Sequence, residues 1–188
     1  MGKKTGLLLV ILAMVLLVIA SVMAKAQSST SSQISSACDS FGVIKSQGER
    51  KAPYFCLKTL DGNNAILDDF KGKPILLQFW ATWCSSCVEE LQMMEKFSEG
   101  RKDQLVILLA AVDGEKEKKI RRVIERKKIT LPILLDPKAR TARNYGVNFI
   151  PISFLINREG LIVGKVVGER DWVSPKAWLA VKELLDLR

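Results

Sequence analysis

The sequence contains no histidine among its 188 residues, and this absence limits the metal chemistry open to it. Structural zinc sites take four ligands, mostly cysteine and histidine. Four cysteines are present, and only Cys84 and Cys87 form a Cys-x-x-Cys pair. Because Cys38 and Cys56 make no second close pair, the pattern disfavours zinc and favours thiol redox chemistry. We expect no metal ion and no other cofactor.

Charge is absent from residues 7–24, which follow Lys3 and Lys4. Two lysines before eighteen mostly apolar residues indicate a secretory signal or a single membrane span. Residues 24–26 (AKA) offer a cleavage site, whereas the length of the run fits a span. We therefore expect residues 1–26 to be a membrane anchor or a signal peptide, with the rest of the chain exported. No cysteine closely follows the run, which argues against a lipoprotein.

Acidic residues are fewer than basic ones, 20 against 29, which gives a formal charge of +9. In an exported chain of mixed charge this balance does not predict nucleic-acid binding; it fits weak attraction to an anionic membrane surface or an acidic partner. Serine and glutamine dominate residues 27–36, so we expect residues 27–50 to be a flexible linker leading into the domain. Residues 51–188 are long enough for one domain with a full core.

The cysteine pair lies in residues 79–87, FWATWCSSC. An apolar run at 74–78 predicts a buried strand before it, and the spacing of apolar residues over 88–97 predicts a helix after it. The pair therefore lies at a helix N-terminus, where free N–H groups and the helix dipole stabilise a thiolate. These positions predict that Cys84 is the nucleophile and that Cys87, one turn further and more buried, resolves the mixed disulfide.

The rest of the domain alternates between strand and helix patterns. A hairpin is predicted over 53–67, with further strands at 105–112, 131–136, 152–156 and 161–168. Helices are predicted at 115–128, 137–145 and 172–188. This order predicts an α/β domain in which a central mixed β-sheet has helices on both faces and an N-terminal β-hairpin.

From about residue 52 to its end, the chain resembles the thioredoxin-fold proteins of the TlpA/ResA/CcmG kind, which are membrane-tethered thiol–disulfide oxidoreductases. The motifs that carry the resemblance occur in the family's order and spacing: APYF at 52–55, LDG at 60–62, FKGKP at 70–74, FWATWC at 79–84 and IPISFLINREG at 150–160. Two positions depart from the family. Ser86 replaces the proline usual before the second cysteine, and Gln92 replaces a proline found in many members. The fold is expected to tolerate both changes, whereas the redox potential is expected to respond.

The resemblance implies roles for residues outside the cysteine pair. By itself Pro151 would be read as an ordinary trans proline at a strand entry, but in thioredoxin folds the matching proline is cis and faces the disulfide. The backbone of Ile150 would then bind an extended client peptide. Glu90, one turn after Cys87, matches a glutamate that influences cysteine ionisation, and partial burial would raise its pKa. We expect Trp80 to lie in the core and Trp83 to shape the exposed rim.

Three readings remain for Cys38 and Cys56: a structural disulfide, two isolated thiols, and a role in metal binding, which the absence of histidine disfavours. In an exported protein the two remaining cysteines are available to each other, so they are expected to form a structural disulfide. The alternative is two isolated thiols, with Cys56 simply packed in its strand.

The resemblance implies a disulfide reductase with haem-binding cysteines of apocytochrome c among its clients. Such an enzyme would act on the extracytoplasmic side of a bacterial cytoplasmic membrane, anchored or secreted, with a membrane thiol–disulfide carrier supplying electrons. Peroxiredoxins share the fold, but the Pro-x-x-x-Thr-x-x-Cys loop of a thiol peroxidase is absent before Cys84. A non-catalytic thioredoxin-like binding module is the third reading, and the presence of both cysteines argues against it.

Overall fold

The computed structural model describes residues 36–187. The strands are β1 (Val43–Lys45), β2 (Cys56–Thr59), β3 (Asn64–Ile66), β4 (Ile75–Trp80), β5 (Val106–Ala111), β6 (Ile133–Leu135), β7 (Ile152–Ile156) and β8 (Ile162–Val167). The α-helices are α2 (Ala37–Phe41), α3 (Ser85–Ser98), α4 (Glu117–Lys127), α5 (Arg140–Asn144) and α6 (Pro175–Leu185). Two short 3-10 helices, η1 (Leu67–Phe70) and η2 (Pro137–Ala139), complete the set.

Within residues 36–187, no helix is both long enough and apolar enough to cross a membrane. The anchor or signal segment predicted at residues 1–26 lies outside the described part of the chain.

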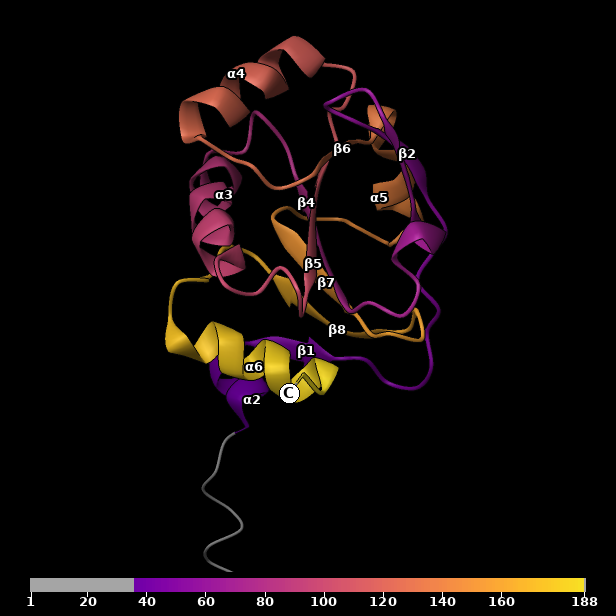
Figure 1. The fold of residues 1–188 in the computed structure, drawn as a ribbon, viewed down its shortest axis with the longest axis vertical. Helices are drawn as coiled ribbons and strands as arrows, with labels where there is room; N and C mark the ends of the chain where they lie inside the picture. The colour runs from indigo at the N-terminus through magenta and orange to yellow at the C-terminus, as the bar shows by residue number, and fades with distance from the viewer. Residues whose placement is uncertain (1–35, 188) are drawn as a thin grey trace, which may run out of the picture. The chain divides into compact units, whose positions relative to one another are not determined.

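One mixed sheet of eight strands, in the order β1-β8-β7-β4-β5-β6-β2-β3, forms the centre of the described domain (Figure 1). Strand β4 lies in its interior, parallel to β5 and antiparallel to β7. All six residues of β4 are buried, which explains why its sequence is almost continuously apolar. The hairpin predicted over 53–67 is confirmed as β2 and β3, and the structure places it beside β6, where it extends the sheet.

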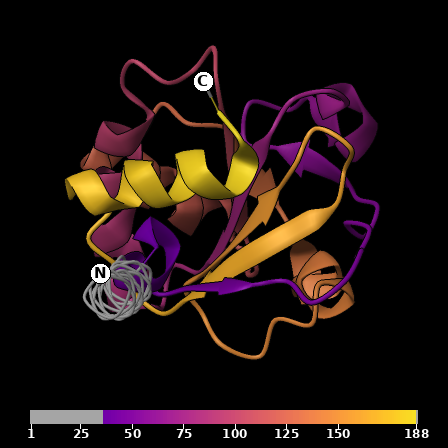
Figure 2. The ribbon, with the colours of Figure 1, turned by 90° about the horizontal axis from the view of Figure 1, so that it is seen from below.

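The two faces of the sheet have separate hydrophobic cores because successive side chains of a strand point to opposite faces. Leu76 and Trp80 of β4 pack with α2, α3, α4 and α6, while Leu77 and Phe79 pack with α5 and the hairpin. Figure 2 shows α6 and α5 on opposite sides of the sheet. The predicted α/β fold with helices on both faces is confirmed, as is the burial of Trp80 in the core.

Residues 36–45 were assigned to a flexible linker over 27–50, but they form structure that the sequence did not predict. Ser36 caps α2 by accepting a hydrogen bond from the Asp39 N–H, and β1 then pairs with β8 at the sheet edge. Helix α2 packs on α6, so residues 36–45 are part of the fold. The last helix is shorter than the predicted 172–188. It begins at Pro175, because proline is tolerated in the first turn of a helix and breaks a helix when it lies in the interior. Trp172 therefore lies in the loop before α6.

The predicted disulfide between Cys38 and Cys56 is wrong: both cysteines are free thiols in the described structure. Cys38 lies in α2, where its Sγ donates to the carbonyl oxygen of Ala180 at 3.4 Å. Cys56 begins β2, and five strands separate β2 from β1, which follows α2 directly. Neighbouring strands are about 4.8 Å apart, whereas disulfide-bonded Cα atoms lie within about 7 Å. Sequence spacing could not reveal that the two thiols belong to opposite halves of the sheet.

Thiol labelling of the oxidised protein should find two free thiols of very different reactivity. Exposed Cys56 should be alkylated promptly under native conditions. Cys38 should react at least about 100-fold more slowly, because it is fully buried and burial raises the pKa of its thiol. Mass spectrometry before and after denaturation measures both rates. A protein without any free thiol in the oxidised state would contradict this assignment.

Candidate active site

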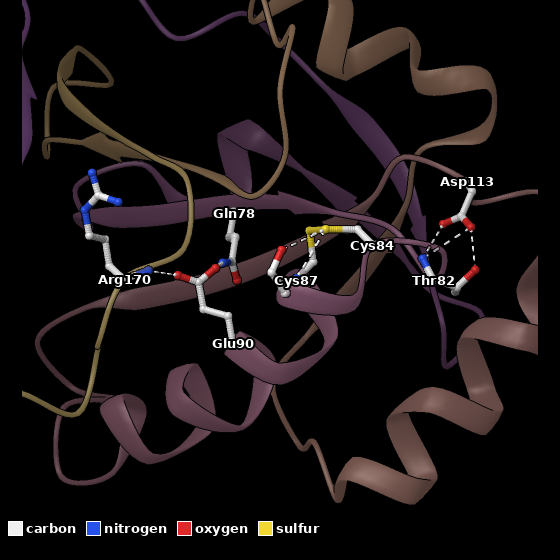
Figure 3. The surroundings of a disulfide bond; sticks show 8 residues. Gln78, Thr82, Cys84, Cys87, Glu90, Asp113 and Arg170 are labelled. Atoms are coloured by element: carbon white, nitrogen blue, oxygen red, sulfur yellow. Dashed lines mark hydrogen bonds between the residues drawn. A yellow bond between two sulfur atoms is a disulfide. The ribbon is translucent and has the colours of Figure 1, made fainter.

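The cysteine pair lies where β4 ends and α3 begins, as predicted. Cys84 occupies the N-cap position of α3, and its Sγ accepts a hydrogen bond from the backbone N–H of Cys87 at 3.2 Å. The two cysteines form a disulfide with their Cα atoms 5.3 Å apart. Figure 3 shows this disulfide with Thr82 and Asp113 on one side and Gln78, Glu90 and Arg170 on the other. On reduction, the same N–H group and the helix dipole are in place to stabilise a Cys84 thiolate.

The two sulfur atoms differ in accessibility. Cys84 is partly exposed, whereas Cys87 is completely buried against the core. A client disulfide can therefore approach Cys84 but not Cys87. The Ser86 hydroxyl lies 3.5 Å from the Cys84 sulfur, so the residue that replaces the family's proline contributes a polar neighbour to the reacting atom.

The turn that precedes Cys84 is held in place by hydrogen bonds to a residue that follows the neighbouring strand, β5. Asp113 follows β5, and its buried carboxylate accepts hydrogen bonds from the Thr82 backbone N–H at 3.3 Å and the Thr82 hydroxyl at 2.6 Å. This contact was not predicted from the sequence. Its signal was an acidic residue directly after a strand parallel to β4, where the carboxyl ends of parallel strands share one edge of the sheet.

Pro151 lies beside the same edge. Ile152 of β7 pairs with Phe79 of β4, so the Ile150–Pro151 bond lies level with the turn that carries the cysteines. That bond is cis, as the family resemblance implied. The carbonyl oxygen of Pro151 accepts from the N–H of Gly168 at 2.9 Å, and partly buried Ile150 packs against both cores.

Exposed aromatic side chains lie next in sequence to both parts of this site. Trp83 directly precedes Cys84 and is 62% exposed, while Phe149 directly precedes Ile150 and is 74% exposed. The predicted position of Trp83 on the rim agrees with this exposure. Exposed large apolar and aromatic side chains are a feature of protein-binding surfaces.

Glu90 is buried, with only 1% of its surface exposed, and it receives three hydrogen bonds. The Arg170 backbone N–H donates to its Oε1 at 3.0 Å, the Trp172 indole N–H donates to the same atom at 2.7 Å, and the Gln78 amide donates to Oε2. Burial raises the pKa of Glu90 to about 7, although the three donors act in the opposite direction. The carboxyl group therefore changes its charge near neutral pH. Its neighbour Glu89 is exposed.

The partners of Glu90 were missed by sequence reasoning. Gln78 was assigned to the buried strand and Trp172 to the last helix, without a role for either polar group. A signal existed for Gln78, because a polar residue inside an apolar strand must find a buried hydrogen-bond partner. No comparable signal marked Trp172 or the Arg170 backbone, which lie 82 and 80 residues from Glu90 in the sequence.

Replacing Trp172 with phenylalanine should raise the pKa of Glu90 further. The change removes a donor that favours the ionised carboxylate, so its cost in folding free energy should grow as pH rises through about 7. We expect a pH-dependent loss of about 1–3 kcal/mol at pH 8 relative to pH 5. Urea unfolding at both pH values measures it. Trp178→Phe is the matched control, since Trp178 also packs on Phe97 but donates no hydrogen bond to Glu90. Equal losses at both pH values would refute the role of the indole N–H.

A disulfide at the N-terminus of the helix that follows a central strand, level with a cis-proline, is the arrangement of thioredoxin-fold proteins that exchange thiols and disulfides. The chain belongs to the AhpC/TSA family, whose profile matches residues 49–165, more than half of its length.

The names of two similar proteins agree with the chemistry of this site. The thioredoxin-like protein YneN of Bacillus subtilis is 40% identical over 124 residues, covering 65% of this chain and 72% of YneN. The thiol-disulfide oxidoreductase ResA of Bacillus cereus is 32% identical over 126 residues, covering 67% of this chain and 73% of ResA. Both matches support the resemblance to proteins of the TlpA/ResA/CcmG kind.

Solved structures lead to the same class. A thiol:disulfide interchange protein DsbE from Chlorobium tepidum has a TM-score of 0.67 at 28% identity, with 74% of this chain and 98% of that chain covered. StoA from Bacillus subtilis has a TM-score of 0.59 at 29% identity, with 68% and 96% covered. With its fold, cysteine pair and relatives taken together, the chain is a thiol–disulfide oxidoreductase.

Proposed function

We propose that this enzyme reduces disulfide bonds of client proteins on the extracytoplasmic side of the membrane. The observation that carries the proposal is the asymmetry of the disulfide: partly exposed Cys84 caps α3 while Cys87 is buried behind it. Residues 1–26 would tether the domain or direct its export, and the polar residues after them would give it reach. Proteins with disulfides or thiols are the partners, and no nucleic acid or cofactor takes part.

In the proposed reaction, the Cys84 thiolate attacks one sulfur of the client disulfide. The client S–S bond breaks, a mixed disulfide with Cys84 forms, and the other client sulfur leaves as a thiolate that takes up a proton. Cys87 then loses its proton and attacks the Cys84 sulfur, which releases the second client thiolate. The client gains two electrons and the enzyme is left with the Cys84–Cys87 disulfide. A membrane thiol–disulfide carrier would return two electrons to the pair.

Three further groups support these steps in the proposal. The backbone of Ile150, beside Pro151, would hold the client segment extended next to Cys84, and Trp83 would contact it on the rim. Glu90 would accept or supply a proton near neutral pH, because its carboxyl group lies one helical turn after Cys87 and has a pKa of about 7. The proposal that haem-binding cysteines of apocytochrome c are among the clients rests on the resemblance to the TlpA/ResA/CcmG kind.

The reduction potential of the Cys84–Cys87 pair tests the direction of the reaction. The protein would be equilibrated in defined thiol buffers and its redox state followed by tryptophan fluorescence and thiol alkylation. A potential near or below about −230 mV supports a reductase, whereas a value near about −120 mV identifies an oxidant and contradicts the cytochrome assignment. Consumption of peroxide by the reduced protein would favour a thiol peroxidase. If the cysteine pair did not titrate reversibly, the result would favour a non-catalytic binding module.

A further inference from the structure

A groove of about 580 Å³ opens directly beside the cysteine pair. Trp83 and Ser85, the two residues that flank Cys84 in the chain, both line it. The first part of α3, as far as Gln92, forms one wall of the groove. Arg126 and Lys127, in the last turn of α4, also line it. A client bonded to Cys84 therefore has this groove next to its own cysteine.

The groove is long enough for a short segment of the client. Gln92 lies eight residues after Cys84 on a helix that begins at Ser85, which corresponds to about 12 Å at 1.5 Å per residue. An extended peptide advances roughly 3.3–3.6 Å per residue, so about three or four residues can lie along α3.

The charge of the groove is mainly positive. Arg126 is exposed and forms no ion pair within residues 36–187. Lys127 donates to the side-chain oxygen of Gln92 at 3.3 Å, a bond that links α4 to α3 and leaves the positive charge of Lys127 unneutralised. Glu89 is the acidic residue of the lining, and it likewise takes part in no ion pair in the described structure. Two cations and one carboxylate thus face the segment next to the reacting sulfur.

We propose that this groove selects clients that carry an acidic side chain within about three residues of the cysteine attacked by Cys84. The inference rests on the proposed reaction with client disulfides and adds a preference among them. The client carboxylate pairs with Arg126, with Lys127 as a second cation, while the exposed face of Trp83 packs against the client backbone. Because the pair is solvent-exposed, its effect is a modest preference.

The test uses the reduced full-length chain and peptides whose single cysteine is joined to thionitrobenzoate. Attack of Cys84 on the peptide sulfur breaks the S–S bond and releases coloured thionitrobenzoate, and Cys87 then releases the peptide thiol. The peptides form sets of three that differ only in having glutamate, glutamine or lysine at one position, and the sets place this position one, two or three residues from the cysteine. We expect the glutamate peptide of at least one set to react about three- to fivefold faster than the glutamine peptide, and the lysine peptide to react more slowly than either. The preference should shrink in 0.5 M salt, because screening shortens the range of exposed charges.

Matched variants separate the groove from the general positive charge of the protein. Arg126→Gln should remove most of the preference for glutamate, whereas Arg122→Gln, an exposed change of equal charge on the same helix that does not line the groove, should retain it. Glu89→Gln should increase the preference. Equal rates for the three peptides of every set, or equal losses in the Arg122 and Arg126 variants, would overturn the inference. Failure of all the peptides to react would instead contradict the proposed reaction itself.

Discussion

Replacing Cys84 with serine is expected to lower disulfide exchange to the uncatalysed background. Cys84 is the sulfur of the pair that a client can reach, since Cys87 is fully buried. A serine hydroxyl at the helix N-terminus is not ionised near neutral pH and cannot form a disulfide, so neither the attack nor the mixed disulfide can occur. Reduction of a peptide disulfide, followed by thiol release, measures the loss. Retained activity would refute the assignment of Cys84 as nucleophile.

The opposite replacement, Cys87→Ser, should give a different defect from the same site. Attack by Cys84 still occurs, but the mixed disulfide with the client cannot be resolved from within the protein and should accumulate. Intact-mass measurement detects the trapped complex. Cys56→Ser is the matched control, because Cys56 is an exposed free thiol on β2 and should have no part in the reaction. If Cys56→Ser also abolished exchange, the proposed roles would need revision.

Replacing Glu90 with glutamine should stabilise the oxidised protein above neutral pH. The ordinary pKa of the carboxyl group is 4.5, and burial raises it to about 7 in the folded protein. Between pH 4.5 and about pH 7, the folded state binds more protons than the unfolded chain. The free energy of unfolding therefore falls as pH rises from 4.5 through about 7. The loss amounts to about 3 kcal/mol at 1.36 kcal/mol per pKa unit. The variant should not show this loss.

The surroundings of Glu90 can accommodate the substitution. The Oε1 atom of Gln78 is buried without a hydrogen bond among the described residues, and a turn of its amide group would present this acceptor to the introduced amide. Trp172 and Arg170 could still donate to the remaining oxygen. Urea unfolding between pH 4 and pH 9 gives the difference between variant and parent. Glu89→Gln, which alters the exposed neighbour, should leave the pH dependence unchanged, and a similar effect in both variants would show that Glu90 is not its source.

Much of the fold and the centre of the site could be predicted from local patterns. The apolar run before Cys84 and the helical spacing after Cys87 located β4 and α3, because burial and backbone geometry impose periods of two and 3.6 residues on a sequence. Ser36–Phe41 and β1 were not predicted, since their short polar-rich sequence forms structure only by packing on α6 and β8. The start of α6 was placed three residues too early because Trp172, which is apolar and buried, fits a helical pattern although it lies in a loop.

The sequence by itself determined the chemistry of this protein. It contains two cysteines at a predicted helix N-terminus, no histidine that could complete a zinc site with them, and the motifs of a thioredoxin-fold family. Only the tertiary structure decided which groups act on that chemistry. It placed Gln78, Arg170 and Trp172 around Glu90, Asp113 beside Thr82, and Cys38 far from Cys56. The reason is that hydrogen bonds, desolvation and disulfide geometry act over a few ångströms in space, and separation along the chain carries little information about such distances once a sheet has brought distant segments together.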